Sequence, residues 1–195
     1  MRALLILLFL FVSSANAEPS YLVHISTEGP RDRVIDDWGS GVLVDPEYVL
    51  TCGHNIGRLR TSITIRFKNG DEIGATVFKR DPIYDLVLLE LDEFRYEKIV
   101  ELSKEGVKTG QTVTIWGFPG DEAESIEGEV SPPIVQLGGF RLDGFRLKGR
   151  AHQGVSGGPA LIGGELVGIQ TGSFPITGIR CADLPQIRKL LEELP

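Results

Sequence analysis

The nine residues from Ala151 to Pro159 read Ala-His-Gln-Gly-Val-Ser-Gly-Gly-Pro and place a serine inside a glycine-rich turn. Glycines on both sides of Ser156 let the backbone adopt conformations closed to other residues and let another molecule come close. Such a turn can present the serine Oγ outward and direct the N–H groups of Gly154 and Ser156 at one point. Donors arranged in this way form an oxyanion hole for an attacked carbonyl. The alternative is a plain glycine-rich loop between strands, so the rest of the chain must supply a base and an acid.

The base has to be a histidine that can reach Ser156 across a cleft. The chain has three histidines: His24 lies in an apolar run typical of a strand, and His152 lies four residues before the serine on the same loop. His54 follows the β-rich run Tyr48–Cys52, at the point where that run breaks. We therefore predict that His54 is the base.

The orienting acid is predicted from the run Asp81–Leu91. Asp85 immediately precedes a continuous apolar run, so it sits where a loop enters a buried strand. A carboxylate in that place is costly unless it is hydrogen-bonded, for example to an imidazole N–H. Asp85 is therefore the predicted partner of His54.

The order His54, Asp85, Ser156 resembles that of chymotrypsin-like serine proteases. Over residues 20–194 the chain is most similar to bacterial trypsin-like peptidases of the HtrA (DegP) type. The resemblance rests on four motifs in the right order: Gly39–Asp45 with Val49–His54, Asp81–Leu91, Gly154–Pro159 with Gly164–Ile169, and Gly178–Ala182.

This resemblance implies a serine endopeptidase that acts on a protein or peptide substrate and needs no cofactor. In the family the serine attacks the scissile carbonyl, the histidine moves its proton, and the aspartate orients the imidazole. Carried over to this chain, the catalytic residues are His54, Asp85 and Ser156, and the N–H groups of Gly154 and Ser156 form the oxyanion hole. The implied walls of the acyl-side pocket are Arg150, Ala151, Thr171, Gly172 and Ser173.

Arg150 leaves two alternatives for the side chain that this pocket accepts. No acid stands at the pocket base, so a preference for Lys or Arg is not expected. If Arg150 extends into solvent, Ala151 leaves a shallow apolar pocket for small or medium aliphatic side chains. If its guanidinium points inward, it selects Asp or Glu. We favour the first alternative, because burying an unpaired arginine in the empty enzyme is costly.

Two departures from the family limit what is carried over. No segment resembling the PDZ domains of HtrA proteins follows the peptidase motifs, so substrate capture and regulation by such a domain are not expected. Val155 stands where trypsin-like zymogens have an aspartate that pairs with a newly freed N-terminal amine. Val155 cannot make that ion pair.

Short β-branched runs alternate with turn residues, and glycine is frequent, with 24 in 195 residues. This composition favours an all-β fold. With the resemblance, the expected fold is a chymotrypsin-like pair of six-stranded antiparallel β-barrels, at about residues 18–95 and 108–183, followed by a short C-terminal helix at about residues 184–194. The predicted strands are Tyr21–Ser26, Gly41–Val44, Tyr48–Thr51, Ser62–Phe67, Glu72–Phe78, Leu86–Leu91, Thr112–Trp116, Ser125–Val130, Phe145–Lys148, Ala160–Ile162, Leu166–Thr171 and Ile179–Ala182.

Residues 1–17 have the features of a signal peptide. Arg2 precedes the apolar run Ala3–Val12, which is too short to span a bilayer comfortably, and Ala15–Ala17 is a small-x-small cleavage site. The alternative is a retained N-terminal anchor. We expect residues 18–195 to be exported, periplasmic or secreted, with no membrane span after cleavage.

The chain is acidic, with 20 Lys and Arg against 27 Asp and Glu and a net charge of −7. Loss of Arg2 with the signal peptide leaves −8. This balance argues against nucleic-acid binding, which needs surfaces rich in Lys and Arg. Neither the charge nor the motifs indicate a particular oligomeric state.

Cys52 and Cys181 form a possible disulfide, because pairing is common in exported chains. If the family alignment holds, both lie near Asp85. The alternative is two buried free thiols. A cysteine nucleophile is not expected, because neither residue lies in the glycine-rich turn. A metal site is not expected either, since the His and Cys residues lack the spacing of zinc ligands.

An alternative function is a catalytically silent trypsin-like scaffold that binds a protein partner through its cleft or its acidic surface. The joint presence of His54, Asp85 and Ser156 argues against it. An esterase or other acyl hydrolase would share the chemistry but not this order of residues in a β-rich chain.

Overall fold

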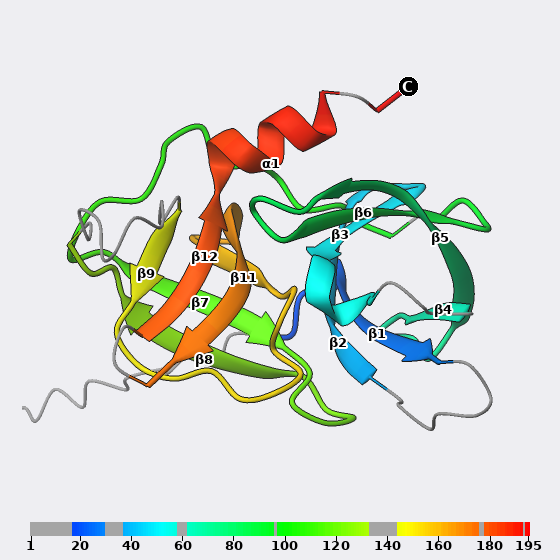
Figure 1. Cartoon of the computed structure of the whole chain (residues 1–195), viewed down its shortest axis with the longest axis horizontal. Helices are drawn as coiled ribbons and strands as arrows, with labels where there is room; N and C mark the ends of the chain where they lie inside the picture. The colour runs from blue at the N-terminus through cyan, green and yellow to red at the C-terminus, as the bar shows by residue number, and fades with distance from the viewer. Residues whose placement is uncertain are drawn as a thin grey trace, which may run out of the picture.

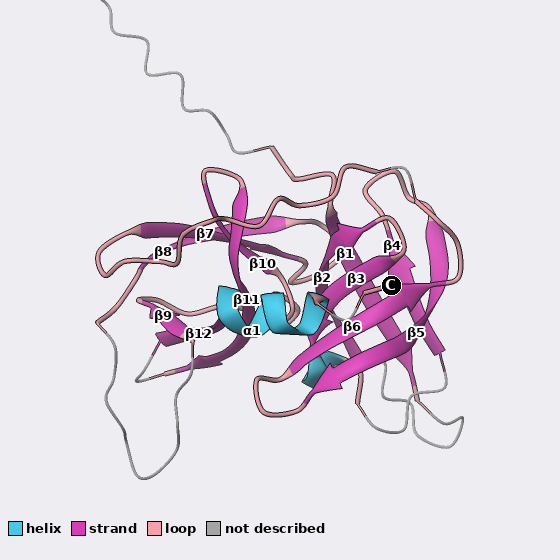
Figure 2. Cartoon of the chain, turned by 90° about the horizontal axis from the view of Figure 1, so that it is seen from above, coloured by secondary structure: helices cyan, strands magenta, loops and turns pink. Residues whose placement is uncertain are grey.

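The structure is a computed structural model that describes residues 17–29, 37–57, 62–95, 97–132, 144–175, 178–192 and 194–195. The predicted signal peptide, apart from Ala17, lies outside these residues. The described chain forms two six-stranded β-units that lie side by side, with one short helix near the C-terminus (Figure 1 and Figure 2).

The first unit is a closed antiparallel barrel with the strand order β1-β2-β3-β6-β5-β4. Pairing of β1 with β4, in which Ile25 lies opposite Ile65, closes the cylinder. The turn at Asn69-Gly70 joins β4 to β5, and Gly70 has a φ of +90°. The strands are β1 (Leu22–Glu28), β2 (Asp37–Asp45), β3 (Tyr48–Cys52), β4 (Ser62–Arg66), β5 (Glu72–Asp81) and β6 (Leu86–Leu91).

Apolar side chains from every strand fill this barrel. Leu22, Ile25, Leu50, Ile65 and Leu88 are fully buried in one continuous cluster. Burial of each such side chain contributes about 1.5–3 kcal/mol to folding. The same cluster continues into the second unit through side chains such as Trp116, Leu166 and Ile169, so the two units share a packed interface.

The second unit is a six-stranded sheet with the order β8-β7-β10-β11-β12-β9. Its six antiparallel strands confirm the expected second unit. Within the described residues this unit is a half-barrel, whose edge strands β8 and β9 meet at a bridge between Val130 and Leu147. The strands are β7 (Thr112–Gly117), β8 (Glu124–Glu129), β9 (Phe145–Leu147), β10 (Pro159–Ile162), β11 (Glu165–Phe174) and β12 (Gly178–Asp183).

The C-terminal helix α1 (Leu184–Leu191) follows β12 directly and ends earlier than the predicted residue 194. The N–H of Asp183 donates to Oε1 of Gln186 at 3.0 Å, which caps the first turn. The helix buries Leu184, Ile187 and Leu190 against the sheet (Figure 1). No helix within the described ranges is long and apolar enough to cross a membrane.

Candidate active site

The loop that carries Ser156 belongs to the second unit, but the first barrel holds it in place. The backbone carbonyl oxygen of Ser156 accepts a hydrogen bond from the N–H of Ser40 at 2.8 Å. It also accepts one from Nδ2 of Asn55 at 2.7 Å. Since Asn55 is the neighbour of His54 in the chain, one side chain ties the serine to the segment of the predicted base.

The glycines of this loop are required by their surroundings. Gly154 and Gly157 have φ angles of +89° and +84°, in the left-handed region that favours glycine. A Cβ at Gly154 would lie 2.1 Å from the carbonyl oxygen of Phe118. A Cβ at Gly157 would lie 2.1 Å from the carbonyl oxygen of Ser40. No other residue fits at these two positions without moving the backbone.

The backbone N–H groups of the loop divide into two sets. Those of Val155, Gly157 and Gly158 donate to the carbonyl oxygens of His152, Gln170 and Val155. Within the described part of the chain, those of Gly154 and Ser156 make no hydrogen bond. The two N–H groups predicted to form the oxyanion hole are therefore free to donate to a bound group.

Ser40 links this loop to the start of the second unit. Its Oγ donates to the carbonyl oxygen of Gly154 at 2.7 Å and accepts the N–H of Phe118 at 2.8 Å. The side chain is fully buried. Ser40 and Asn55 were not among the predicted site residues. Both are buried polar residues that hydrogen-bond to distant backbone atoms. A single sequence does not indicate such a role beyond the motif in which the residue stands.

His54 lies in a single 3₁₀ turn, Gly53–Asn55, directly after β3. Its Nδ1 is 2.6 Å from Oδ2 of Asp85, which fits an Nδ1–H group donating to the carboxylate. The exposed fractions of the two side chains are 48% and 33%, so Asp85 is less buried than its place before an apolar strand suggested. This pair leaves Nε2 as the basic nitrogen.

Asp85 is positioned by the turn that precedes β6. Oδ1 of Asp81 accepts the N–H groups of Ile83 and Tyr84 at 3.0 and 3.2 Å and so closes the turn. Asp85 itself has a φ of +58°, a conformation that aspartate tolerates better than most residues. Its carbonyl oxygen accepts the N–H of Gly53 at 2.8 Å. The acid and base segments are thus joined through the backbone as well as through their side chains.

Nε2 of His54 faces a thiol. Sγ of Cys52 lies 3.6 Å from it. Within the described chain no hydrogen bond joins Nε2 to Ser156; catalytic hydrogen bonds are often long before substrate binds. A donor atom from each of Cys52, His54 and Asp85 lies within 4.8 Å of the others, so the three could hold a metal ion. Burial and the charge of Asp85 raise the pKa of the Cys52 thiol, which disfavours the thiolate that a metal ion needs.

The possible disulfide between Cys52 and Cys181 is not formed, since both residues are free and buried. Cys52 lies beside the His54–Asp85 pair, whereas Cys181 packs in the core of the second unit. Burial also raises the pKa of the Cys181 thiol. The alternative of two buried thiols describes the structure.

The predicted pocket residues lie on two connected segments. Arg150 is exposed, while Ala151 packs against the second core and donates its N–H to Oγ of Ser173 at 3.1 Å. Thr171 is buried on β11, and within the described chain its Oγ1 has no hydrogen-bond partner. Gly172 follows it. A pocket of about 420 Å³ opens beside His54 and Asp85 and is also lined by Arg80.

A profile of the trypsin-like peptidase domain matches residues 39–169 of this chain. The chain belongs to the trypsin-like peptidase family.

Curated relatives are named as proteases. The chain is 27% identical over 150 residues to a probable periplasmic DegP-like serine endoprotease of Bartonella henselae, which covers 72% of this chain and 29% of the relative. It is 30% identical over 148 residues to the probable periplasmic DegP-like serine endoprotease of Brucella suis, an alignment that covers 72% of this chain and 28% of the relative. It is 28% identical over 144 residues to the human peroxisomal leader peptide-processing protease, with 69% and 25% covered. The chain thus spans less than a third of the length of these relatives.

Solved structures show the same fold. The active form of the Rv3671c protease from M. tuberculosis has a TM-score of 0.77 at 22% identity, covering 89% of this chain and 80% of the other. A serine endoprotease from Yersinia pestis has a TM-score of 0.73 at 24% identity, covering 89% and 62%.

Proposed function

We propose that this protein is a serine endopeptidase that hydrolyses peptide bonds through an acyl-enzyme formed on Ser156. One observation carries the proposal. Nδ1 of His54 is 2.6 Å from Asp85, while the neighbouring Asn55 holds the carbonyl oxygen of Ser156. The paired base and acid and the serine loop are therefore joined at one junction between the two units.

In the proposed mechanism Ser156 Oγ attacks the scissile carbonyl carbon while Nε2 of His54 takes its proton. Asp85 accepts the Nδ1–H bond, fixes the tautomer and stabilises the imidazolium. The oxyanion is bound by the N–H groups of Gly154 and Ser156. His54 then gives the proton to the leaving amine, and water hydrolyses the ester by the same steps in reverse order.

The Cys52 thiol has to share Nε2 with the serine in this mechanism. A neutral S–H group is a weak donor, so a serine hydroxyl drawn close by substrate can replace it at Nε2. Ser156 would then move by the small distance that tightening of an active site on substrate binding involves.

Residues 18–195 are the proposed peptidase domain, exported to the periplasm or secreted after removal of residues 1–17. The charge pattern of the N-terminal segment supports export. The DegP-like relatives, whose names include the word periplasmic, support it as well.

A fluorophosphonate probe tests the proposal, because it reacts with a serine that is activated by a base. The expressed chain should be labelled on Ser156, and Ser156→Ala should remove the label. Peptide and ester substrates are assayed beside it. Labelling with peptide cleavage supports an endopeptidase, and ester turnover without peptide cleavage supports another acyl hydrolase. A folded wild-type chain that neither labels nor cleaves would overturn the proposal in favour of a silent scaffold.

A further inference from the structure

Two arginines lie side by side on the sheet of the second unit. Arg146 of β9 is directly opposite Arg180 of β12 in the antiparallel register. Directly opposite residues have their Cβ atoms about 4.5–5.5 Å apart, and like charges in such a pair repel. Arg146 is 9% exposed and Arg180 is partly buried, so solvent screens this repulsion poorly.

Two nitrogen atoms of this pair have no hydrogen-bond partner in the described part of the chain. They are Nη1 of Arg146 and Nε of Arg180, and both are buried. Among the residues that the structure describes, no carboxylate forms an ion pair with either arginine. A guanidinium does not lose its proton in proteins, so both groups stay charged. Buried charge without a partner is costly, and a bound anion would reduce that cost.

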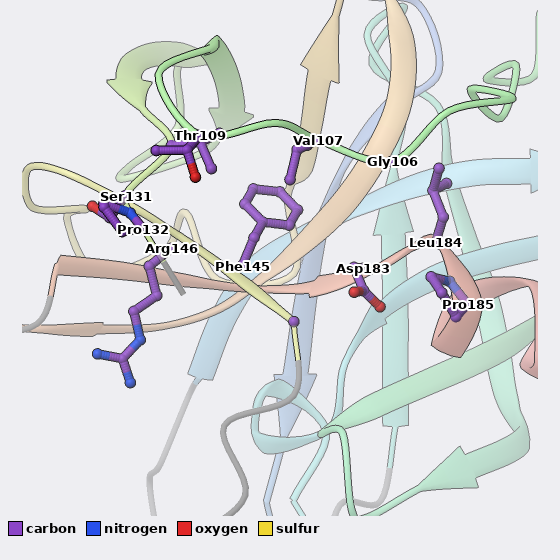
Figure 3. A pocket seen from close by; sticks show the side chains of 12 residues that line it. Gly106, Val107, Thr109, Ser131, Pro132, Phe145, Arg146, Asp183, Leu184 and Pro185 are labelled. Carbon is purple, nitrogen blue, oxygen red and sulfur yellow. The ribbon is translucent and has the colours of Figure 1, made fainter. Parts of the chain in front are cut away.

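The arginine pair faces away from the core. Ile179 and Cys181, on either side of Arg180, are fully buried in the second core, so Arg180 points to the opposite face of β12. Figure 3 shows the same for β9, where the side chains of Phe145 and Arg146 point to opposite sides of the strand. A pocket of about 290 Å³ near the start of α1 is lined by Phe145 and also by Arg146.

The register places this face next to the serine loop. Arg180 is directly opposite Gly172 of β11, so the two share one face of the sheet. Two residues earlier on β11, the carbonyl oxygen of Gln170 accepts the N–H of Gly157, the residue after Ser156, at 2.8 Å. One residue after Gly172, Oγ of Ser173 accepts the N–H of Ala151.

Gly172 carries no side chain to separate the serine loop from Arg180. A Cβ there would contact only the Phe174 ring, at 3.2 Å.

We propose that Arg180, supported by Arg146, forms an anion-binding end to the acyl-side pocket and selects substrates with Asp or Glu immediately before the scissile bond. The inference rests on the proposed endopeptidase function and names the substrate class of the same site. A guanidinium presents paired N–H donors that match a carboxylate. A substrate carboxylate would supply the acceptor and the negative charge that the pair lacks.

This assignment reverses the preference expected from the sequence. Arg150, the arginine found by counting back from Ser156, is exposed and lies on neither of the two strands that carry the arginine pair. The cations are instead supplied by β12, which pairs with β11, and by β9, which pairs with the other edge of β12. An apolar pocket for aliphatic side chains is not compatible with one buried and one partly buried arginine at its end.

The test compares peptides that differ only in Glu, Gln or Val before the cut. We expect kcat/KM for the Glu peptide to exceed that for the Gln peptide by about 10- to 100-fold, the range of a charged hydrogen bond. Arg180→Gln should abolish this ratio, and Arg146→Met should reduce it. Arg188→Gln, which removes an exposed arginine from α1, is the matched control and should keep it. Equal cleavage of the Glu and Gln peptides by the wild type would overturn the inference, as would loss of the ratio in Arg150→Ala alone.

Two further measurements keep the test decisive. Fluorophosphonate labelling is run on every variant: labelling without acidic preference refutes this inference alone, whereas no labelling of the folded wild type refutes the proposed function. Thermal unfolding separates recognition from a structural role. If the pair is held for substrate, Arg146→Met removes an unpaired buried charge and should raise Tm while it lowers the Glu preference. A lower Tm with the Glu preference unchanged would show that Arg146 serves only the fold.

Discussion

Sγ of Cys52 lies 3.6 Å from Nε2 of His54, so the nitrogen proposed to activate the serine has a buried thiol as its neighbour. Nδ1 of the same ring is paired with Asp85. The thiol stays protonated, because burial and the nearby carboxylate raise its pKa. It therefore meets Nε2 as a weak neutral donor and not as a second nucleophile.

The first prediction follows from this protonation state. A disulfide-exchanging thiol reagent at pH 8 should leave both cysteines of the native protein unreacted, since it attacks thiolates that it can reach. After unfolding without reductant, two thiols per chain should react. Absorbance of the released reagent measures the count, and Cys181→Ala, with one thiol, provides the control. No reactive thiol in the unfolded, unreduced protein would show that the two cysteines are paired.

The second prediction concerns the acid. Asp85→Asn should lower kcat about 10⁴-fold, because an amide in place of the carboxylate favours the wrong imidazole tautomer. Asp81→Asn is the matched control. It lies on the same turn and keeps an oxygen for the N–H groups of Ile83 and Tyr84, so kcat should change little. The two variants are compared by steady-state peptide hydrolysis. A severe effect of Asp81→Asn with a mild one of Asp85→Asn would mean that the acid is wrongly assigned.

The third prediction concerns Asn55. Asn55→Ala removes the side-chain donor to the Ser156 carbonyl oxygen and leaves one acceptor site in a buried region unfilled. The free energy of unfolding should fall by about 1–3 kcal/mol. kcat should fall more than KM rises, because the loop that carries the serine loses an anchor. Urea denaturation and steady-state kinetics measure the two effects.

Asn69→Ala, in the exposed turn between β4 and β5, is the control for this substitution. It removes hydrogen bonds to Asp71 but none to the site. If Asn55→Ala matched it in both stability and kcat, the anchor would have no role in turnover.

The fourth prediction is a pH dependence of stability that arises at His24. Burial chiefly, and the charge of Arg66 next, lower the pKa of this side chain, against the opposing effect of Asp121 and Glu72. The unfolded chain, with a histidine pKa of about 6.5, therefore binds the proton first as pH falls. Above the unfolded-state pKa, His24 should not lower the free energy of unfolding. As pH falls from that pKa toward the lower folded-state pKa, His24 should lower the free energy of unfolding increasingly.

Urea midpoints at pH 8.0 and pH 5.5 measure this effect. The wild type should lose more stability between the two values than His24→Gln does. His152→Gln, which replaces an exposed histidine, should behave as the wild type. Equal losses in the wild type and His24→Gln would assign the pH dependence to other groups.

The sequence was informative where apolar residues form uninterrupted or alternating runs. The strand β6 has the predicted bounds, Leu86–Leu91, because its apolar run is fully buried. The strands β5 and β11 are longer than predicted, ending at Asp81 and Phe174. Each contains a register shift, between Val77 and Lys79 and between Gln170 and Gly172. A bulge breaks the alternation of apolar and polar side chains while backbone pairing continues. A strand predicted from that alternation therefore ends before the real strand does.

The residues around the candidate site that the sequence did not indicate share one property. His54, Asp85 and Ser156 could be proposed from local motifs, since each stands at the end or start of a recognisable run. Ser40 and Asn55 act on backbone atoms more than a hundred residues away. Arg180 and Arg146 become neighbours only through strand register. Contacts of that kind depend on which strands pair, and local patterns in one sequence do not show that pairing.

The fifth prediction is that a peptide extension before Glu18 leaves kcat/KM unchanged. Val155 is fully buried in the second core, where it has no charge to offer a terminal amine. Two matched proteins, one beginning at Glu18 and one with six extra residues, are compared in the same peptide assay. A loss of activity in the extended protein that its removal restores would show that a free terminus is needed.

The burial of Val155 also decides which conditions can disorder the serine loop. An ion pair at this position would weaken when pH changed the charge of its partners or when salt screened their attraction. An apolar anchor has no titration curve, and its strength near room temperature comes mainly from the entropy of water, so it weakens on cooling and in the presence of denaturants. For this loop, temperature and co-solvent take the place that ionisation holds in zymogens with an aspartate at this position.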